Sequence, residues 1–68
     1  MNEIFKLVCS YEDGTEEIFP RIFFDKEKAI ERATEMRQKD EACTGVRIYT
    51  EVADTELGSF VTKSWKDF

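Results

Sequence analysis

Four stretches of the chain alternate apolar with polar residues in the two-residue period that is typical of a β-strand. They are Ile4–Tyr11, Glu16–Phe24, Thr44–Val52 and Leu57–Trp65. Between the second and third stretches, apolar residues recur at the spacing of one helix face, which predicts a helix over Lys26–Lys39. Asp25 precedes this segment and is predicted to be its N-cap, because a carboxylate accepts hydrogen bonds from the free N–H groups of the first helical turn.

The pair Asp13–Gly14 lies between the first two predicted strands and predicts a two-residue type I′ turn. Such a turn needs positive φ at both positions, which Asp tolerates and Gly adopts freely. The turn would place Cys9 opposite Ile18. Pro20 has no backbone N–H to donate, so the second strand is predicted to be an edge strand or to bulge at this position.

The order β-β-α-β-β predicts an α+β fold of two layers, with one helix packed on a four-stranded, mainly antiparallel sheet. Residues 1–68 are expected to form a single domain, since the chain is too short for two. Alternation assigns ten residues to the helix-facing side of the sheet. They are Phe5, Leu7, Cys9, Ile18, Ile22, Val46, Ile48, Val52, Val61 and Trp65.

The same alternation assigns six large apolar residues to the opposite side, more than a solvent-exposed sheet face usually carries. They are Ile4, Val8, Phe19, Phe23, Tyr49 and Phe60. This face is therefore predicted to be an interface, through which two copies of the chain associate. A register shift of one residue in the third or fourth strand is the alternative explanation, because it would redistribute these side chains.

Composition argues against catalysis and cofactor binding. The chain has 15 acidic and 10 basic residues, a formal net charge of -5, and no histidine. It therefore lacks the usual general base and the Ser-His or Cys-His pairs of nucleophilic enzymes. Two cysteines without histidine do not complete a zinc site within one chain, and the glycines stand too far apart for a phosphate loop. We expect no enzyme activity, no cofactor and no bound metal.

Four carboxylates crowd the tip of the first predicted hairpin, namely Glu12, Asp13, Glu16 and Glu17. A catalytic carboxylate pair needs a cleft that excludes water and raises one pKa, and a protruding turn supplies none. These residues are predicted instead to form an acidic surface for a partner.

A net negative charge also argues against direct binding of nucleic acid. If both hairpin loops lay at the same end of the sheet, the acidic rim would suit a DNA mimic.

The remaining features favour a cytoplasmic protein. The amino terminus has no basic segment followed by a long apolar run, and the longest apolar run, Ile22–Phe24, is far too short to span a membrane. Cys9 and Cys43 are expected to be buried free thiols in a reducing compartment. No membrane partner is expected.

The string YEDGTEEIF…FFDKEKAIERATEMRQ…VRIYTEV resembles small uncharacterised accessory proteins encoded by bacteriophages and prophages. An acidic EDG hairpin, a helix that begins with FDKEKA and a return to strands carry the resemblance over nearly the whole chain. It implies a stoichiometric inhibitor of a host enzyme or defence complex that works as a compact dimer, and it implies no catalytic residue.

The sequence thus favours a non-catalytic protein-binding module that forms a homodimer, with a partner that the sequence does not identify. Two other functions stay open. One is a protein that sequesters a small ligand or nucleotide in a pocket between subunits. The other is the acidic DNA mimic.

Overall fold

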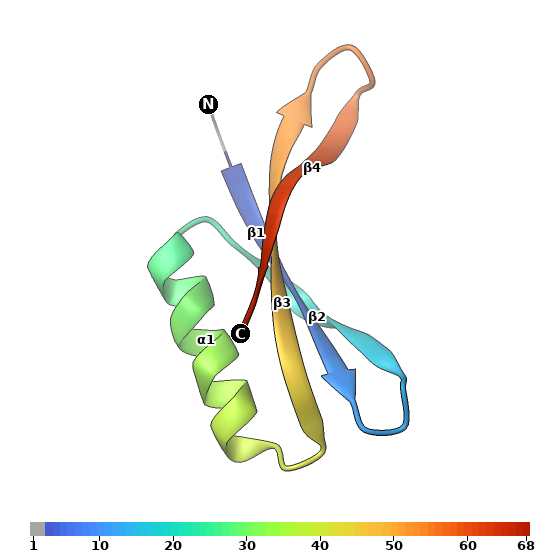
Figure 1. Ribbon diagram of the computed structural model, residues 1–68. Helices are drawn as coiled ribbons and strands as arrows, with labels where there is room; N and C mark the ends of the chain where they lie inside the picture. Colours follow the sequence, from blue (N-terminus) through green and yellow to red (C-terminus); the bar gives the residue numbers. More distant parts are fainter. Residues whose placement is uncertain (1–2) are drawn as a thin grey trace.

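A computed structural model describes residues 3–68, which contain four strands and one helix (Figure 1). In chain order they are β1 (Glu3–Tyr11), β2 (Glu16–Phe23), α1 (Lys26–Lys39), β3 (Cys43–Asp54) and β4 (Ser59–Asp67). The strands form one antiparallel sheet with the order β2-β1-β3-β4. The predicted α+β class and β-β-α-β-β order are confirmed. No helix in the described range has the length and apolar composition needed to cross a membrane.

Helix α1 begins and packs as its sequence predicts. The Asp25 carboxylate accepts a hydrogen bond from the backbone N–H of Glu27 at 2.9 Å, which confirms the N-cap. Ala29 and Ala33 are buried, and their small side chains allow the helix to approach the sheet closely. The helix lies against β1, β2 and β3.

The buried cluster lies between α1 and the two central strands, β1 and β3. Its members are each at most 6% exposed. They are Phe5, Leu7, Cys9, Ala29, Ala33, Cys43, Val46 and Ile48. Five of the ten residues predicted on the helix-facing side, namely Phe5, Leu7, Cys9, Val46 and Ile48, are therefore confirmed as core residues, and Cys43 joins them without having been predicted there. Phe68 packs against the cluster and exchanges backbone hydrogen bonds of 2.8 and 3.1 Å with Val46.

The first hairpin turn has a three-residue loop, Glu12–Gly14, and not the predicted two-residue loop. The backbone N–H of Tyr11 donates to the carbonyl of Thr15 at 2.9 Å, and that of Gly14 donates to the carbonyl of Tyr11 at 3.0 Å. Gly14 has a φ of +86°, whereas Asp13 does not take a positive φ. A type I′ turn needs positive φ at both central residues, so the predicted turn type is wrong.

The longer loop reverses the predicted faces of β2. Ile18 pairs with Val8, and Ile22 also faces away from α1. Phe19 and Phe23 stack with ring centroids 6.0 Å apart and pack against the buried cluster on the helix side. The predicted faces of these four β2 residues are wrong, because a slip of one residue moves each side chain of a strand to the other face.

Both edge strands contain a local irregularity. Pairing of β2 with β1 shifts where Pro20 lies, which confirms the prediction of an edge strand or a bulge at this proline. Pairing of β4 with β3 shifts at Lys63, which is the extra residue on its strand. This extra residue turns Trp65 away from α1 and opposite Tyr49, although simple alternation placed Trp65 on the helix side.

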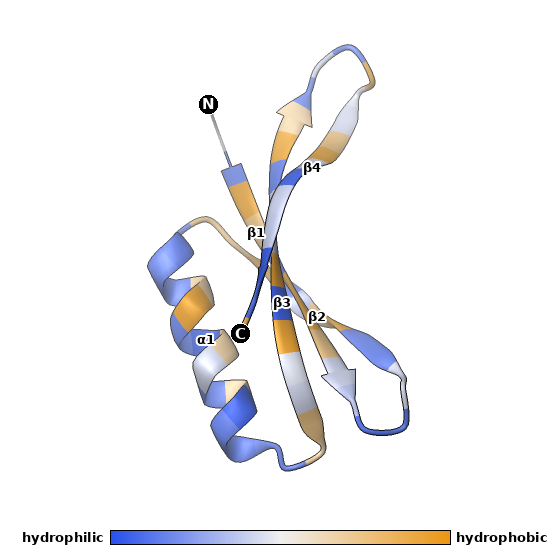
Figure 2. Cartoon of the chain, in the orientation of Figure 1, coloured by the Kyte–Doolittle hydropathy of each residue, from blue (hydrophilic) through white to orange (hydrophobic). Residues whose placement is uncertain are grey.

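The two hairpin loops lie at opposite ends of the sheet (Figure 1). The β1–β2 loop lies near the carboxyl end of α1, whereas the β3–β4 loop extends beyond its amino end. In the part of the β3–β4 hairpin that lies beyond the amino end of α1, both strands still contain hydrophobic residues (Figure 2). The condition for an acidic rim built from both loops is therefore not met.

Candidate functional site

The sheet face opposite α1, which we term the open face, has two rows of side chains that cross all four strands. The registers of the three strand pairs define the rows. From β2 to β4, the first contains Ile18, Val8, Arg47 and Asp67, and the second contains Ile22, Lys6, Tyr49 and Trp65. Each row therefore combines apolar with charged side chains.

Four large apolar residues on this face are each at least 50% exposed, namely Ile18, Ile22, Phe60 and Trp65. Burial of such side chains is a main source of association free energy. Of the six predicted interface residues, Val8, Tyr49 and Phe60 lie on the open face, and Ile4 lies there but is buried. Phe19 and Phe23 do not, because they pack on the helix side.

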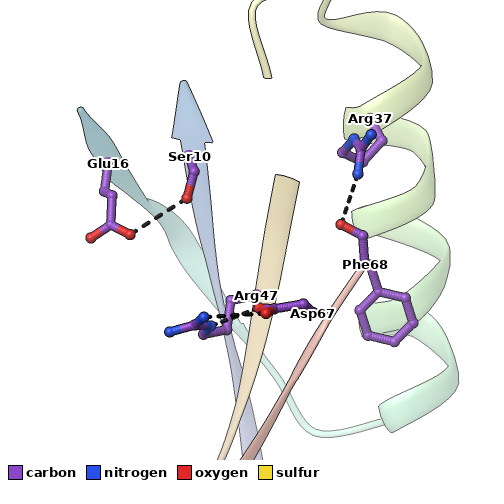
Figure 3. A network of polar contacts seen from close by, with 6 residues as sticks. All are labelled: Ser10, Glu16, Arg37, Arg47, Asp67 and Phe68. Carbon is purple, nitrogen blue, oxygen red and sulfur yellow. Dashed lines mark hydrogen bonds and ion pairs between the residues drawn. The ribbon is translucent and has the colours of Figure 1, made fainter. Parts of the chain in front are cut away.

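The cations of the open face already have carboxylate partners. Arg47 forms a two-point contact with Asp67, at 2.7 Å from Nε and 3.2 Å from Nη2 (Figure 3). Its guanidinium lies 4.0 Å from the centre of the Trp65 ring. Lys6 Nζ lies 3.7 Å from a Glu51 oxygen. Hydrogen bonds from Arg47 hold the pKa of Asp67 below its ordinary value of 3.8.

A hollow of about 440 Å³ lies on the open face between β2 and β4. Its lining combines an apolar floor with polar and charged side chains. The lining residues are Lys6, Val8, Glu16, Ile18, Tyr49, Glu51 and Thr62. The open face is therefore concave, and its concave part is neither wholly apolar nor basic.

The predicted acidic surface lies at the tip of the β1–β2 hairpin and is exposed. The Asp13 carboxylate accepts hydrogen bonds from the Thr15 hydroxyl at 2.6 Å and from its backbone N–H at 2.9 Å, which lower the pKa of Asp13. Ser10 donates to Glu16 at 3.4 Å on the open face (Figure 3). Glu17 follows Glu16 in β2 and therefore faces the other side, so the predicted carboxylates surround the tip.

Two further carboxylates lie beside this tip, on the turn between α1 and β3. The backbone N–H of Glu12 donates to the carbonyl of Ala42 at 3.3 Å, which brings the loop against this turn. Asp40 and Glu41 are exposed there. Their proximity follows from the pairing of β1 with β3, which no local sequence pattern specifies. We term the six residues the acidic end: Glu12, Asp13, Glu16, Glu17, Asp40 and Glu41.

Cys9 and Cys43 are both buried, and their sulfur atoms lie 2.7 Å apart. Burial raises the pKa of the Cys9 thiol to about 11, and the Cys43 thiol adds to this effect. Within residues 3–68, no three cysteine, aspartate or glutamate side chains are arranged to hold a metal ion.

In comparisons with protein-family models, curated proteins and solved structures, no match to this chain was found.

Proposed function

We propose that this protein is a non-catalytic binding module that forms a homodimer through its open face and contacts a protein partner through its acidic end. One observation carries the proposal: the open face exposes four large apolar side chains, Ile18, Ile22, Phe60 and Trp65. Exposed apolar surface gathered on one face usually marks an interaction site. In this proposal the sheet and α1 form two layers, and a second copy covers the sheet.

The charges of the open face favour a second copy over a nucleic acid. A base-stacking platform needs free cations for phosphate, whereas Lys6 and Arg47 are engaged with Glu51 and Asp67. A face that carries both charge signs around apolar side chains is suited to pack against itself across a two-fold axis.

A specific geometry follows from the strand order. A two-fold axis that lies in the interface, parallel to the strands, places β2 of one copy over β4 of the other. Ile18 and Ile22 of one copy then pack toward Trp65 of the other, so that their exposed surfaces cover one another. The apolar surface buried in the dimer would add to the stability of the fold, because a chain of this size can form only a small core of its own.

Five residues of the acidic end stay uncovered in this dimer, because they lie at the hairpin tip, on the helix side of β2 or on the turn after α1, whereas Glu16 lies on the open face. We therefore propose a basic surface on the protein partner, which the carboxylates would attract over a distance set by the salt concentration. Inhibition of a host enzyme is the function that the resemblance to phage accessory proteins adds to this proposal.

The decisive experiment measures the solution mass by light scattering over a dilution series. We expect twice the 8.0 kDa mass of the chain for the wild type, and the mass of one chain for the double variant Ile18→Ser/Ile22→Ser. Because both isoleucines are exposed, the variant should keep the circular dichroism of the folded chain. The matched control is Phe24→Ser, which removes an apolar residue of 83% exposure outside the strands and should leave the dimer intact. A wild-type monomer at every concentration would refute the homodimer.

The hollow on the open face favours a second candidate, a small ligand held between the two copies. Its volume of about 440 Å³ lies within the usual range for small-molecule sites. A ligand that binds only the folded dimer would raise its melting temperature. A panel of nucleotides and other metabolites tests this candidate, and stabilisation should be lost in the Ile18→Ser/Ile22→Ser variant.

A further inference from the structure

The two cysteines come from distant parts of the chain and meet in the core. Cys9 lies within β1, and Cys43 is the first residue of β3, 34 positions later. Their sulfur atoms are 2.7 Å apart, whereas the bonded distance in a disulfide is about 2.05 Å. A shift of less than about 1 Å would bring them to bonding distance. The chain contains no third cysteine that could form an alternative disulfide with either of them.

A bulge places Cys43 on the same side of the sheet as Cys9. In the β1–β3 ladder, Ser10 pairs with Gly45 and Tyr11 pairs with Cys43, so Thr44 is the extra residue. Without it, strict alternation from Val46 would direct Cys43 to the open face. The bulge therefore has a specific result, which is the juxtaposition of two thiols inside the core.

We propose that Cys9 and Cys43 form an intramolecular disulfide by exchange with a small-molecule disulfide, and that this bond fastens β1 to the start of β3. The structure shows the reduced, dithiol form. The bond would close a loop that contains β2 and α1, both of which pack against the same core. The inference does not depend on the proposed dimer, because both thiols lie on the helix side of the sheet.

The exchange has two steps. The Cys43 sulfur, as thiolate, attacks one sulfur of the reagent; the reagent's S–S bond breaks, and the leaving half takes up the proton that Cys43 lost. The Cys9 sulfur then attacks the Cys43 sulfur of this mixed disulfide and releases the second half, which takes up the proton from Cys9. Two protein thiols are oxidised to one disulfide, and one reagent disulfide is reduced to two thiols.

The order of attack follows from the position of each thiol. Cys43 adjoins the exposed turn after α1, so opening of the first residues of β3 gives a reagent access to it. Cys9 lies within a central strand that is paired on both sides, so its thiol is less accessible to a reagent than that of Cys43. Because both thiols are buried in the closed form, oxidation should be slow and limited by this opening.

The test treats the folded chain with oxidised glutathione. We expect a product lighter by two hydrogen atoms, with no thiol that reacts after denaturation. A tryptic map should show residues 7–21 linked to residues 40–47, since trypsin cleaves after Lys6, Arg21, Lys39 and Arg47. The bond should raise Tm by about 10–20 °C, and a reductant should reverse the rise.

Cys9→Ala and Cys43→Ala are the matched controls, and neither should gain thermal stability from the oxidant. The mass and the tryptic map of the wild type decide the question even if a control fails to fold. Two free thiols after prolonged oxidation, stable glutathione adducts on both cysteines, or disulfides only between chains would each overturn the proposal.

Discussion

The two faces of the sheet are built from the same strands and differ in what covers them. On the helix side, Leu7 and Ile48 pair across β1 and β3, and both are buried beneath α1. On the open face, Ile18 and Trp65 are more than half exposed. Alternation makes both faces partly apolar, but one short helix covers only one of them. The difference indicates that the helix-side core specifies the fold, and the exposed open face is the surface that the proposed dimer would use.

The largest effect expected from this comparison concerns two adjacent residues of β1, Leu7 and Val8. Leu7→Ala should reduce the free energy of unfolding by about 2–5 kcal/mol, because it leaves a cavity under α1. Val8→Ala removes a half-buried side chain from the open face and should cost about 1 kcal/mol or less. Urea unfolding at matched protein concentration measures both losses. Equal losses would mean that the two faces contribute equally to the stability of the fold.

An intermediate effect is expected from alkaline pH, which acts on the helix-side core through Cys9. Its pKa rises from an ordinary 9.0 to about 11 on folding, so the folded state disfavours the thiolate. The contribution to stability is fully present below pH 9.0 and is lost as the pH rises through about 11. The melting temperature of the wild type should therefore fall as the pH is raised from 8, and the part of this fall that is due to Cys9 should be absent from Cys9→Ala and from the oxidised protein. If the melting temperature of Cys9→Ala fell by the same amount, the alkaline loss of stability would be due to other titratable groups.

The smallest effect concerns the ion pair of the open face. Arg47 lowers the pKa of Asp67 below 3.8, so the pair stabilises the folded state above that pH and this contribution is lost as the pH falls below it. Because both side chains are exposed, the effect should be small and should weaken with added salt. Asp67→Asn should show a shallower loss of Tm in acid than the wild type. The control variant Glu56→Gln removes an exposed carboxylate from the β3–β4 loop and should leave the dependence of Tm on acid pH unchanged.

Elements with strong local signals were predictable from the sequence. The helix over Lys26–Lys39 and its Asp25 cap are as predicted, because helical spacing and capping involve only neighbouring residues. The central strands were also assigned to the correct faces, as Leu7 and Ile48 show. Their pairing is regular from Glu3 to Ser10 in β1 and from Gly45 to Val52 in β3, and only the bulge at Thr44 interrupts it.

The faces of the edge strands were not predictable in the same way. Asp13–Gly14 fits both a two-residue turn and a three-residue loop in which only Gly14 takes positive φ, and the choice sets the register of all of β2. Trp65 was assigned to the wrong face because a bulge at Lys63 has no clear sequence signal. The candidate site was consequently predicted in outline, with Val8, Tyr49 and Phe60 on the open face but with Phe19 and Phe23 in place of Ile18 and Ile22.

The irregular pairing in both edge strands also bears on how the chain behaves at high concentration. A sheet elongates by adding strands to a regular free edge, which is how fibrils grow. Here one edge contains Pro20, which has no N–H to offer, and the other is distorted around the charged Lys63. Neither edge is a continuous template for another strand. In the proposed dimer, contact between molecules occurs instead at the sheet face, where association about a two-fold axis would close after two copies and would not continue into a fibre.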